Sequence, residues 1–368
     1  MMKMKISLFL AILLTITTVV VAGCSSTTEP TATPDIQILV IHSYHEGWAW
    51  NSDIEAGIIE GLSQQGYAID IDYEIETFYM DTKVTYTTVE QIEERAALAV
   101  DMIEESDPDI IFVNDDNALK YVAVEYAADN PESVLPFVFC GINIDPSVYE
   151  PVESLEHPGG KITGTLERFP YSEAFALAVR IAPDAESIVL LADSSTSSDA
   201  VLEDFRANYL NAVNNSPIEM IGFAQLNTFD EWKAAVTEYQ TQVDFVGIIT
   251  YHQLRDDSGN VVPAQDVVDW TVANNNLPEL GFLTFHAEDG YLSTAGVDGY
   301  KTGIYTGIIG GDILNGTDPG NIPIVNPDVV EIAFNLCRAD MLGITIPTAE
   351  LAAAGKVFHS IGINGTCP

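Results

Sequence analysis

The chain is poor in basic residues. Lysine and arginine together number 14 in 368 residues, against 55 aspartates and glutamates, so the formal net charge is −41. Nucleic-acid binding depends on lysines and arginines that neutralise phosphates, and this balance therefore argues against it. It argues equally against binding to anionic lipid head groups. An acidic surface bears on solubility and not on the fold. It suits a salty environment, in which salt screens the repulsion between the negative charges.

Motifs of several enzyme classes are missing as well. The sequence has neither a Gly-x-x-x-x-Gly-Lys phosphate loop nor a Gly-x-Gly-x-x-Gly dinucleotide fingerprint. Ser43 lies between His42 and His45 but not in the Gly-x-Ser-x-Gly turn of a nucleophile elbow. The two histidines have no cysteine or second histidine pair nearby, so we expect no metal site. No catalytic residue and no cofactor are predicted.

Cysteines are few: the chain has four. Cys140 follows an apolar strand, which is typical of a small buried thiol. Cys337 and Cys367 lie near the end of the chain and could form a disulfide in an oxidising compartment. Asn-Gly-Thr at Asn315 and at Asn364 could accept a glycan if the host has that machinery.

The amino-terminal segment reads as a targeting signal. Lys3 and Lys5 precede an uncharged apolar run at 6–22, which is marginal for spanning a membrane, so residues 1–23 are predicted to be a signal peptide. The small residues before Cys24 resemble the lipobox of prokaryotic lipoproteins, which implies that Cys24 is lipidated. A plain signal peptide or an uncleaved anchor is the alternative. Residues 24–34 would then form the anchor and a tether too polar to fold.

The remaining part, about 335 residues, is long for one core and suits two lobes. Short apolar runs alternate with helical patterns in both halves, and the rhythm restarts after the His-Pro-Gly-Gly break at 157–160. Such βαβ series predict two Rossmann-like lobes, each with a parallel sheet covered by helices. We expect one lobe at 35–143 plus 287–316 and the other at 144–286 plus 317–368.

Polar and aromatic residues follow nearly every predicted strand. Open parallel sheets bind ligands beyond the carboxyl ends of their strands, so these residues are candidates for a small-molecule cleft. Each also has a structural alternative as a helix cap, a turn former or a packing residue. The segments concerned are 42–45 with Trp48 and Trp50, 114–117, 140–143, 193–196, 251–252 and 285–286.

Several blocks of the sequence, in order, resemble a known family. They include "ILVIHSYHEGWAWNSDIEAGIIEGL", "IIFVNDDNALKYV", "PFVFCGINID" and "ITGTLERFPYSE". They are similar to ABC-type substrate-binding proteins related to the tryptophan/tyrosine-binding lipoproteins, over about 36–347. The resemblance implies the periplasmic binding protein type I fold, with three crossovers that form a hinge. It also implies binding rather than catalysis.

The predicted ligand-binding set combines the resemblance with the strand-end pattern. The resemblance implies cleft contacts at Ser43, Tyr44, Asp115, Asp116, Asn143, Ser194, Ser195 and Tyr251. It also places Glu167 and Arg168 near the first crossover, and Glu167 is included in the set. The strand-end pattern adds Trp50, Phe285 and His286. The block "HSYHEGWAW" departs from the amino-acid-binding members, so the ligand class stays open among amino acids, sugars and other metabolites.

The predicted function is that of a monomeric solute receptor outside the cell. The chain would be anchored by lipid to the outer face of the cytoplasmic membrane, bind a small molecule and deliver it to an ABC permease. A sensor that passes ligand occupancy to a membrane signalling protein is the alternative. A hydrolase on the same scaffold is less favoured.

Overall fold

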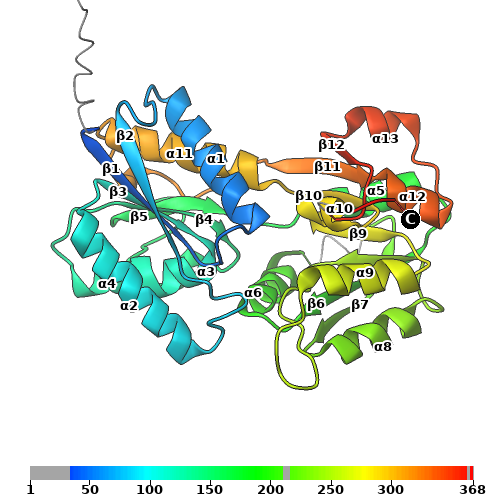
Figure 1. Cartoon of the computed structure of the whole chain (residues 1–368). Helices are drawn as coiled ribbons and strands as arrows, with labels where there is room; N and C mark the ends of the chain where they lie inside the picture. The colour runs from blue at the N-terminus through cyan, green and yellow to red at the C-terminus, as the bar shows by residue number, and fades with distance from the viewer. Residues whose placement is uncertain (1–33, 210–215, 363–364, 368) are drawn as a thin grey trace, which may run out of the picture. The chain divides into compact units, whose positions relative to one another are not determined.

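The computed structural model describes residues 34–209, 216–362 and 365–367 (Figure 1). The predicted signal peptide, Cys24 and nearly all of the tether lie outside the described residues, as does Asn364. Within the described ranges, no helix has the length and apolar character needed to cross a membrane.

The first sheet has five parallel strands in the order β2-β1-β3-β4-β5. They are β1 (Ile36–His42), β2 (Tyr73–Tyr79), β3 (Ile110–Asn114), β4 (Phe137–Ile142) and β5 (Ile162–Leu166). The last three are buried along their whole length, as expected for parallel strands covered on both faces.

Helices cover both faces of this sheet (Figure 1). One face packs against α1 (Ala49–Gln64) and α11 (Gly299–Leu314). The other packs against α2 (Val89–Ser106) and a helical stretch at 115–129, which comprises α3 (Asp115–Ala118), the π-helical η1 (Leu119–Val124) and α4 (Glu125–Asp129). A capping box at Thr88 satisfies the first turn of α2.

Helices α1 and α11 meet along glycines although they lie far apart in the sequence. A Cβ atom at Gly57 would clash with the carbonyl oxygen of Tyr300, and one at Gly303 would clash with that of Ile54. The partner atoms belong to the backbone and cannot turn aside. The close packing of α1 on α11 therefore requires glycine at these positions.

The second sheet has seven strands in the order β12-β11-β10-β9-β8-β6-β7. All neighbours are parallel except β10 and β11, which are antiparallel. The strands are β6 (Ser187–Asp193), β7 (Glu219–Leu226), β8 (Phe245–Ile248), β9 (Glu279–Leu283), β10 (Ser293–Val297), β11 (Val330–Asn335) and β12 (Lys356–Phe358).

The helices of the second lobe follow the same βαβ pattern. They are α5 (Tyr171–Ile181), α6 (Thr196–Asp204) with the π-helical η3 (Phe205–Tyr209), α8 (Phe229–Tyr239), α9 (Ala264–Asn274), α10 (Phe285–Asp289), α12 (Leu336–Leu342) and α13 (Thr348–Ala353). Short 3-10 turns occur at η2 (Pro146–Val148) and η4 (Pro319–Asn321). A disulfide joins Cys337 of α12 to Cys367, with 5.4 Å between the Cα atoms, and Cys140 is a buried free thiol.

The predicted two-lobed α/β architecture is confirmed. The chain passes between the sheets three times, after β5, after β10 and before β11. The lobe boundaries differ from the predicted ones. Residues 144–166 end in β5, which pairs with β4 of the first sheet, so the break at 157–160 is only the loop between them. Residues 293–297 form β10 and belong to the second sheet.

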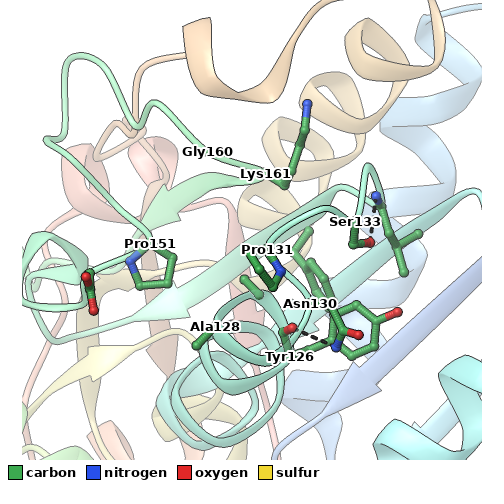
Figure 2. A pocket seen from close by; sticks show the side chains of 12 residues that line it. Tyr126, Ala128, Asn130, Pro131, Ser133, Pro151, Gly160 and Lys161 are labelled. Carbon is green, nitrogen blue, oxygen red and sulfur yellow. Dashed lines mark hydrogen bonds between the residues drawn. The ribbon is translucent and has the colours of Figure 1, made fainter.

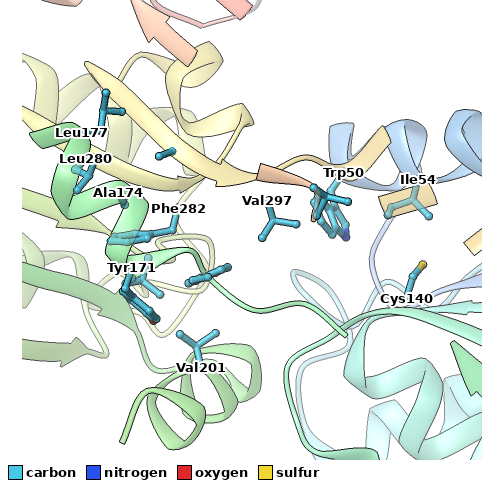
Figure 3. Close-up of a cluster of buried hydrophobic side chains, with 14 of the residues drawn as sticks. Trp50, Ile54, Cys140, Tyr171, Ala174, Leu177, Val201, Leu280, Phe282 and Val297 are labelled. Atoms are coloured by element: carbon cyan, nitrogen blue, oxygen red, sulfur yellow. The ribbon is translucent and has the colours of Figure 1, made fainter. Parts of the chain in front are cut away.

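A single buried apolar cluster runs through both lobes (Figure 3). It includes Trp50 and Ile54 of α1 on one side and Leu177 and Phe282 of the second lobe on the other, with Val297 between them. The lobes therefore share apolar packing beside the crossovers, in addition to polar contacts across the gap.

Candidate ligand-binding cleft

A cavity lies at the carboxyl ends of the strands of both sheets. The first lobe and its crossover line it with Tyr44, Trp48, Trp50, Lys83, Asp115, Asn143, Glu167 and Phe169, and the second lobe with Ser197, Val201, Thr250, His252, Leu283 and Phe285. Its volume is only about 30 Å³, room for a water molecule or two. A solute can enter only if the lobes or the lining side chains move apart.

Aromatic rings form one wall of the cavity. The ring of Trp48 lies 4.6 Å from that of His252 and 5.8 Å from that of Phe285, nearly perpendicular to both. Trp48 comes from the first lobe and its two partners from the second. Such edge-to-face contacts stabilise aromatic groups and leave ring faces for a planar ligand.

Two buried carboxyl groups, Asp115 and Glu167, and the amino group of Lys83 belong to the lining of the cavity. Asp115 has a φ of +70°, which a residue with a Cβ rarely adopts, and begins α3. Burial raises the pKa of Asp115 well above its usual range, and Glu167 raises it further. Burial also raises the pKa of Glu167 to about 7. The Lys83 ammonium lies 4.3 Å from the centre of the Tyr44 ring.

Asp116 and Arg168 hold these groups in place from outside the cavity. The Oδ1 atom of Asp116 accepts hydrogen bonds from the backbone N–H groups of Asn143 (3.2 Å) and Ile144 (3.1 Å). Arg168 donates to the carbonyl oxygens of Ile142, Asn143 and Glu167. Asn143 in turn donates from Nδ2 to Glu167 Oε1 at 3.2 Å.

Polar contacts join the two lobes across the gap. Tyr44 and Ser197 share a hydrogen bond of 2.7 Å between their hydroxyl oxygens. Arg255 donates from Nη2 to Thr87 Oγ1 at 3.1 Å. Arg168 forms an ion pair of 3.0 Å with Asp204 of α6. These contacts hold the two lobes close together in this structure.

Of the twelve predicted site residues, six line the cavity: Tyr44, Trp50, Asp115, Asn143, Glu167 and Phe285. Three serines that the sequence singled out do not line it. Ser43 Oγ donates to the carbonyl oxygen of Asn114 (2.7 Å) and accepts from the backbone N–H of Ala118 (2.9 Å), so it fixes the start of the helical stretch. Ser194 is exposed, and Ser195 caps α6.

Tyr251 and His286 lie behind the lining residues. The Tyr251 hydroxyl is hydrogen-bonded to Asp289, and its ring is 4.1 Å from that of His252. His286 is fully buried, and burial lowers its pKa to about 3. Tyr251 therefore packs directly on His252, and the ring of His286 lies 4.8 Å from that of Phe285.

Other lining residues were not predicted from the sequence. Lys83 follows β2, an edge strand whose carboxyl end was not considered as part of the cleft. Ser197 and Val201 lie on α6, beyond the strand-end segment. Trp48 and His252 lie in strand-end segments that were identified as candidates. The sequence pattern gave no reason to choose them over their neighbours as ligand-binding residues.

A larger pocket of about 370 Å³ lies elsewhere in the first lobe (Figure 2). Tyr126, Pro131, Pro151 and Lys161 are among its lining residues, with Phe137, the first residue of β4. It is therefore at the amino ends of β4 and β5, the opposite edge of the sheet from the cleft. The residues that the structure describes contain no group of three or more histidine, cysteine, aspartate or glutamate side chains placed to hold a metal ion.

Comparison with known proteins identifies the architecture. A family model described as "ABC transporter substrate binding protein" matches residues 36–358. The chain belongs to this family. The resemblance seen in the sequence is therefore confirmed, and the family is one of solute-binding proteins.

One curated protein is similar in sequence to part of this chain. The tyrosine-binding protein of Clostridioides difficile strain R20291 is 24% identical over 227 residues, or 61% of this chain. The match spans 62% of the length of that curated relative.

Three solved structures share the fold over most of the chain. A domain from Streptococcus pneumoniae in complex with L-Trp has a TM-score of 0.65 and 22% identity, covering 88% of this chain and 99% of that one. A conserved domain protein of Vibrio cholerae has a TM-score of 0.64 and 19% identity, with the same coverage. The ligand-free, open structure of a Clostridium difficile substrate-binding protein with adhesive properties has a TM-score of 0.61 and 18% identity, covering 88% and 100%.

Proposed function

We propose that this family member captures a small solute outside the cytoplasmic membrane and delivers it to an ABC importer. The observation that carries the proposal is a cavity at which strand ends of both lobes converge. In open α/β sheets this edge is the usual place for a ligand. The proposal includes a lipid anchor at Cys24, which would hold the receptor near its permease.

We propose further that the solute carries a planar ring. Rings of Tyr44, Trp48, Trp50 and Phe285 surround the cavity, together with the apolar side chain of Leu283. Such a lining favours a flat apolar group over a polar one. The tyrosine-binding relative and the structure in complex with L-Trp support this reading.

The mechanism that we propose is hinge closure around the solute. The open form admits the ligand, and contacts from both lobes favour the closed form that the permease recognises. The preference of the ligand for the closed form sets how far the population shifts. Tyr44, Trp50, Asp115 and Asn143 would contact the ligand from the first lobe, and Phe285 from the second.

Two measurements test the proposal. Mass spectrometry of small molecules released from natively purified protein should identify a ring-bearing solute. That solute should change the tryptophan fluorescence, and the change should be lost in a Trp48→Phe/Trp50→Phe variant but kept in Trp270→Phe, whose ring packs on Phe229 away from the cleft. A fluorescence change that survives the double replacement would contradict the assignment of the cleft.

The anchor is tested separately. Replacement of Cys24→Ser should move the protein from the membrane fraction to the medium or periplasm, without a change in solute affinity. Retention in the membrane fraction would refute the lipid anchor and leave the binding function untouched.

A further inference from the structure

This inference rests on the proposed function and concerns how closure of the cleft comes to depend on the ligand. The polar side chains that line the cavity from the second lobe, in the described structure, are those of Ser197, Thr250 and His252. Ser197 shares a hydrogen bond with Tyr44. Thr250 Oγ1 donates one to Asp193 Oδ1 at 3.0 Å. Both ring nitrogens of His252 are buried and have no hydrogen-bond partner in the described part of the chain. His252 is therefore the lining side chain of this lobe whose hydrogen-bonding groups are all free for a ligand.

His252 is held firmly in this position. The backbone N–H of Gln253 donates to the buried Asp193 carboxylate at 2.9 Å, which fixes the segment that follows β8. The His252 ring lies 4.1 Å from that of Tyr251 in the same lobe and 4.6 Å from that of Trp48 in the first lobe. Only 4% of the residue is exposed. The ring therefore has almost no access to bulk water while the lobes are close together, and it regains that access when Trp48 withdraws with the first lobe.

An unpaired imidazole at this place opposes closure of the empty cleft. Burial lowers the pKa of His252 well below its usual value, so the ring is neutral, with one nitrogen that donates a hydrogen bond and one that accepts. In the open form, water pairs with both nitrogens. In the closed form they lose this water, and buried donors and acceptors that stay unpaired cost free energy. The empty closed form carries this cost, and the open form does not.

The empty cavity offers little relief from this cost. Its volume of about 30 Å³ has room for a water molecule or two. Trp50 Nε1 and Asp115 Oδ2, which belong to the first-lobe side of the lining, are also buried and without a partner among the described residues. The same water would have to serve all of these groups. A ligand with polar groups beside its ring can pair with both lobes at once.

We propose that His252 is the residue through which the ligand closes the cleft. Unpaired, it opposes closure of the empty protein. A hydrogen bond between His252 and a polar group of the ring-bearing solute removes this opposition and adds a contact that only the closed form makes. The first lobe offers Trp50 and Asp115 to the solute in the open form, so binding to the open form does not need His252. The preference of the solute for the closed form, and with it the shift of the population, depends on His252.

Distances between spin labels on the two lobes test the first half of the proposal without any ligand. Labels at Ala97→Cys of α2 and Ala234→Cys of α8, both exposed positions, report the ratio of closed to open molecules. His252→Phe keeps a ring against Trp48 and removes both nitrogens. The ratio in the empty protein should rise about tenfold, because the variant has no unpaired nitrogen to bury. A ratio that is unchanged or lower overturns the inference.

Two matched variants show whether the nitrogens are responsible. His252→Gln keeps a donor and an acceptor, so its ligand-free ratio should be no higher than that of the wild type. His359→Phe, at an exposed histidine of the second lobe, should leave the distances unchanged. A His252→Gln protein as closed as His252→Phe overturns the inference, since hydrogen bonding would then not be the cause.

L-tryptophan and L-tyrosine, each at a saturating concentration, serve as ring-bearing probes for the second half. They should raise the ratio of closed to open molecules in the wild type, and about tenfold less in His252→Phe. If His252→Phe responds as strongly as the wild type, the inference is overturned and the proposed function stands. If neither probe moves the lobes of the wild type, the proposed binding of these rings is overturned, and the ligand-free comparison still decides the role of His252.

Discussion

Removing the hydroxyl group of Tyr44 should shift the protein towards its open form. This hydroxyl and that of Ser197 share a 2.7 Å hydrogen bond between the lobes. Tyr44 is buried and Ser197 half-buried, so water can replace the lost partner at Ser197 once the lobes separate. A neutral hydrogen bond of this kind contributes about 1 kcal/mol. The ratio of closed to open molecules should therefore fall about fivefold in Tyr44→Phe.

Distances between spin labels measure this ratio without any ligand. Ala97 of α2 and Ala234 of α8 are exposed helical residues, one on each lobe, and can be replaced by cysteine for labelling. Cys140 is buried and Cys337 is disulfide-bonded, so neither competes for the label. The fraction of molecules at the longer distance should rise in Tyr44→Phe.

A variant of Ser197 and a control variant of an exposed tyrosine test whether the Tyr44–Ser197 hydrogen bond causes this shift. Ser197→Ala should give the same shift, and the double variant should be no more open than either single one, because the two changes remove one interaction. Tyr305→Phe, at an exposed tyrosine of α11, should leave the distances unchanged. An unaltered distance distribution in Tyr44→Phe would refute the reasoning.

Three further predictions concern stability, each measured by urea unfolding. Burial raises the pKa of Glu167 from 4.5 to about 7, so the folded protein binds this proton more tightly than the unfolded chain. The free energy of unfolding of the wild type, compared with that of Glu167→Gln, should therefore fall by about 3 kcal/mol as the pH rises from 4.5 to 7. The same pH dependence in both proteins would contradict this prediction. Gly303→Ala should cost about 2 kcal/mol because its Cβ meets backbone of α1, whereas Gly222→Ala, with its nearest neighbour at 3.9 Å, should cost little; equal effects would count against the glycine contact. Cys337→Ser opens a disulfide spanning 30 residues and should cost about 3–4 kcal/mol, an effect that reduction of the wild type should reproduce.

The sequence was a good guide to elements and a poor guide to which sheet they join. Apolar runs such as 110–114 and 137–142 are strands because they are buried on both faces, and periodicity detects this. Both lobes use the same βαβ rhythm, so nothing local distinguishes a fifth strand of one sheet from a first strand of the next. The segment 162–166 was assigned to the second lobe as part of residues 144–286 and was not predicted as a strand, although it forms β5 and pairs with β4.

The candidate site was predictable only where a strand end points straight into the cleft. Tyr44, Asp115 and Asn143 follow β1, β3 and β4 and line the cavity. Tyr251 follows β8 in the same way, yet its side chain is turned into the core beside Asp289. Neighbouring residues at a strand end point in different directions, and the pattern does not say which of them faces the ligand. Lys83 comes from the long loop after β2, for which composition and spacing carry no signal.

The dependence of the first lobe on α11 has a consequence for how the protein is made. The glycine face of α1 has its partner about 250 residues further along the chain. A polypeptide synthesised from its amino end cannot complete this lobe until the second lobe's sheet has largely been made, since β6 to β10 precede α11. If the chain is exported in an unfolded state, the late synthesis of α11 would keep the first lobe from folding inside the cell. Both lobes could then fold together after export.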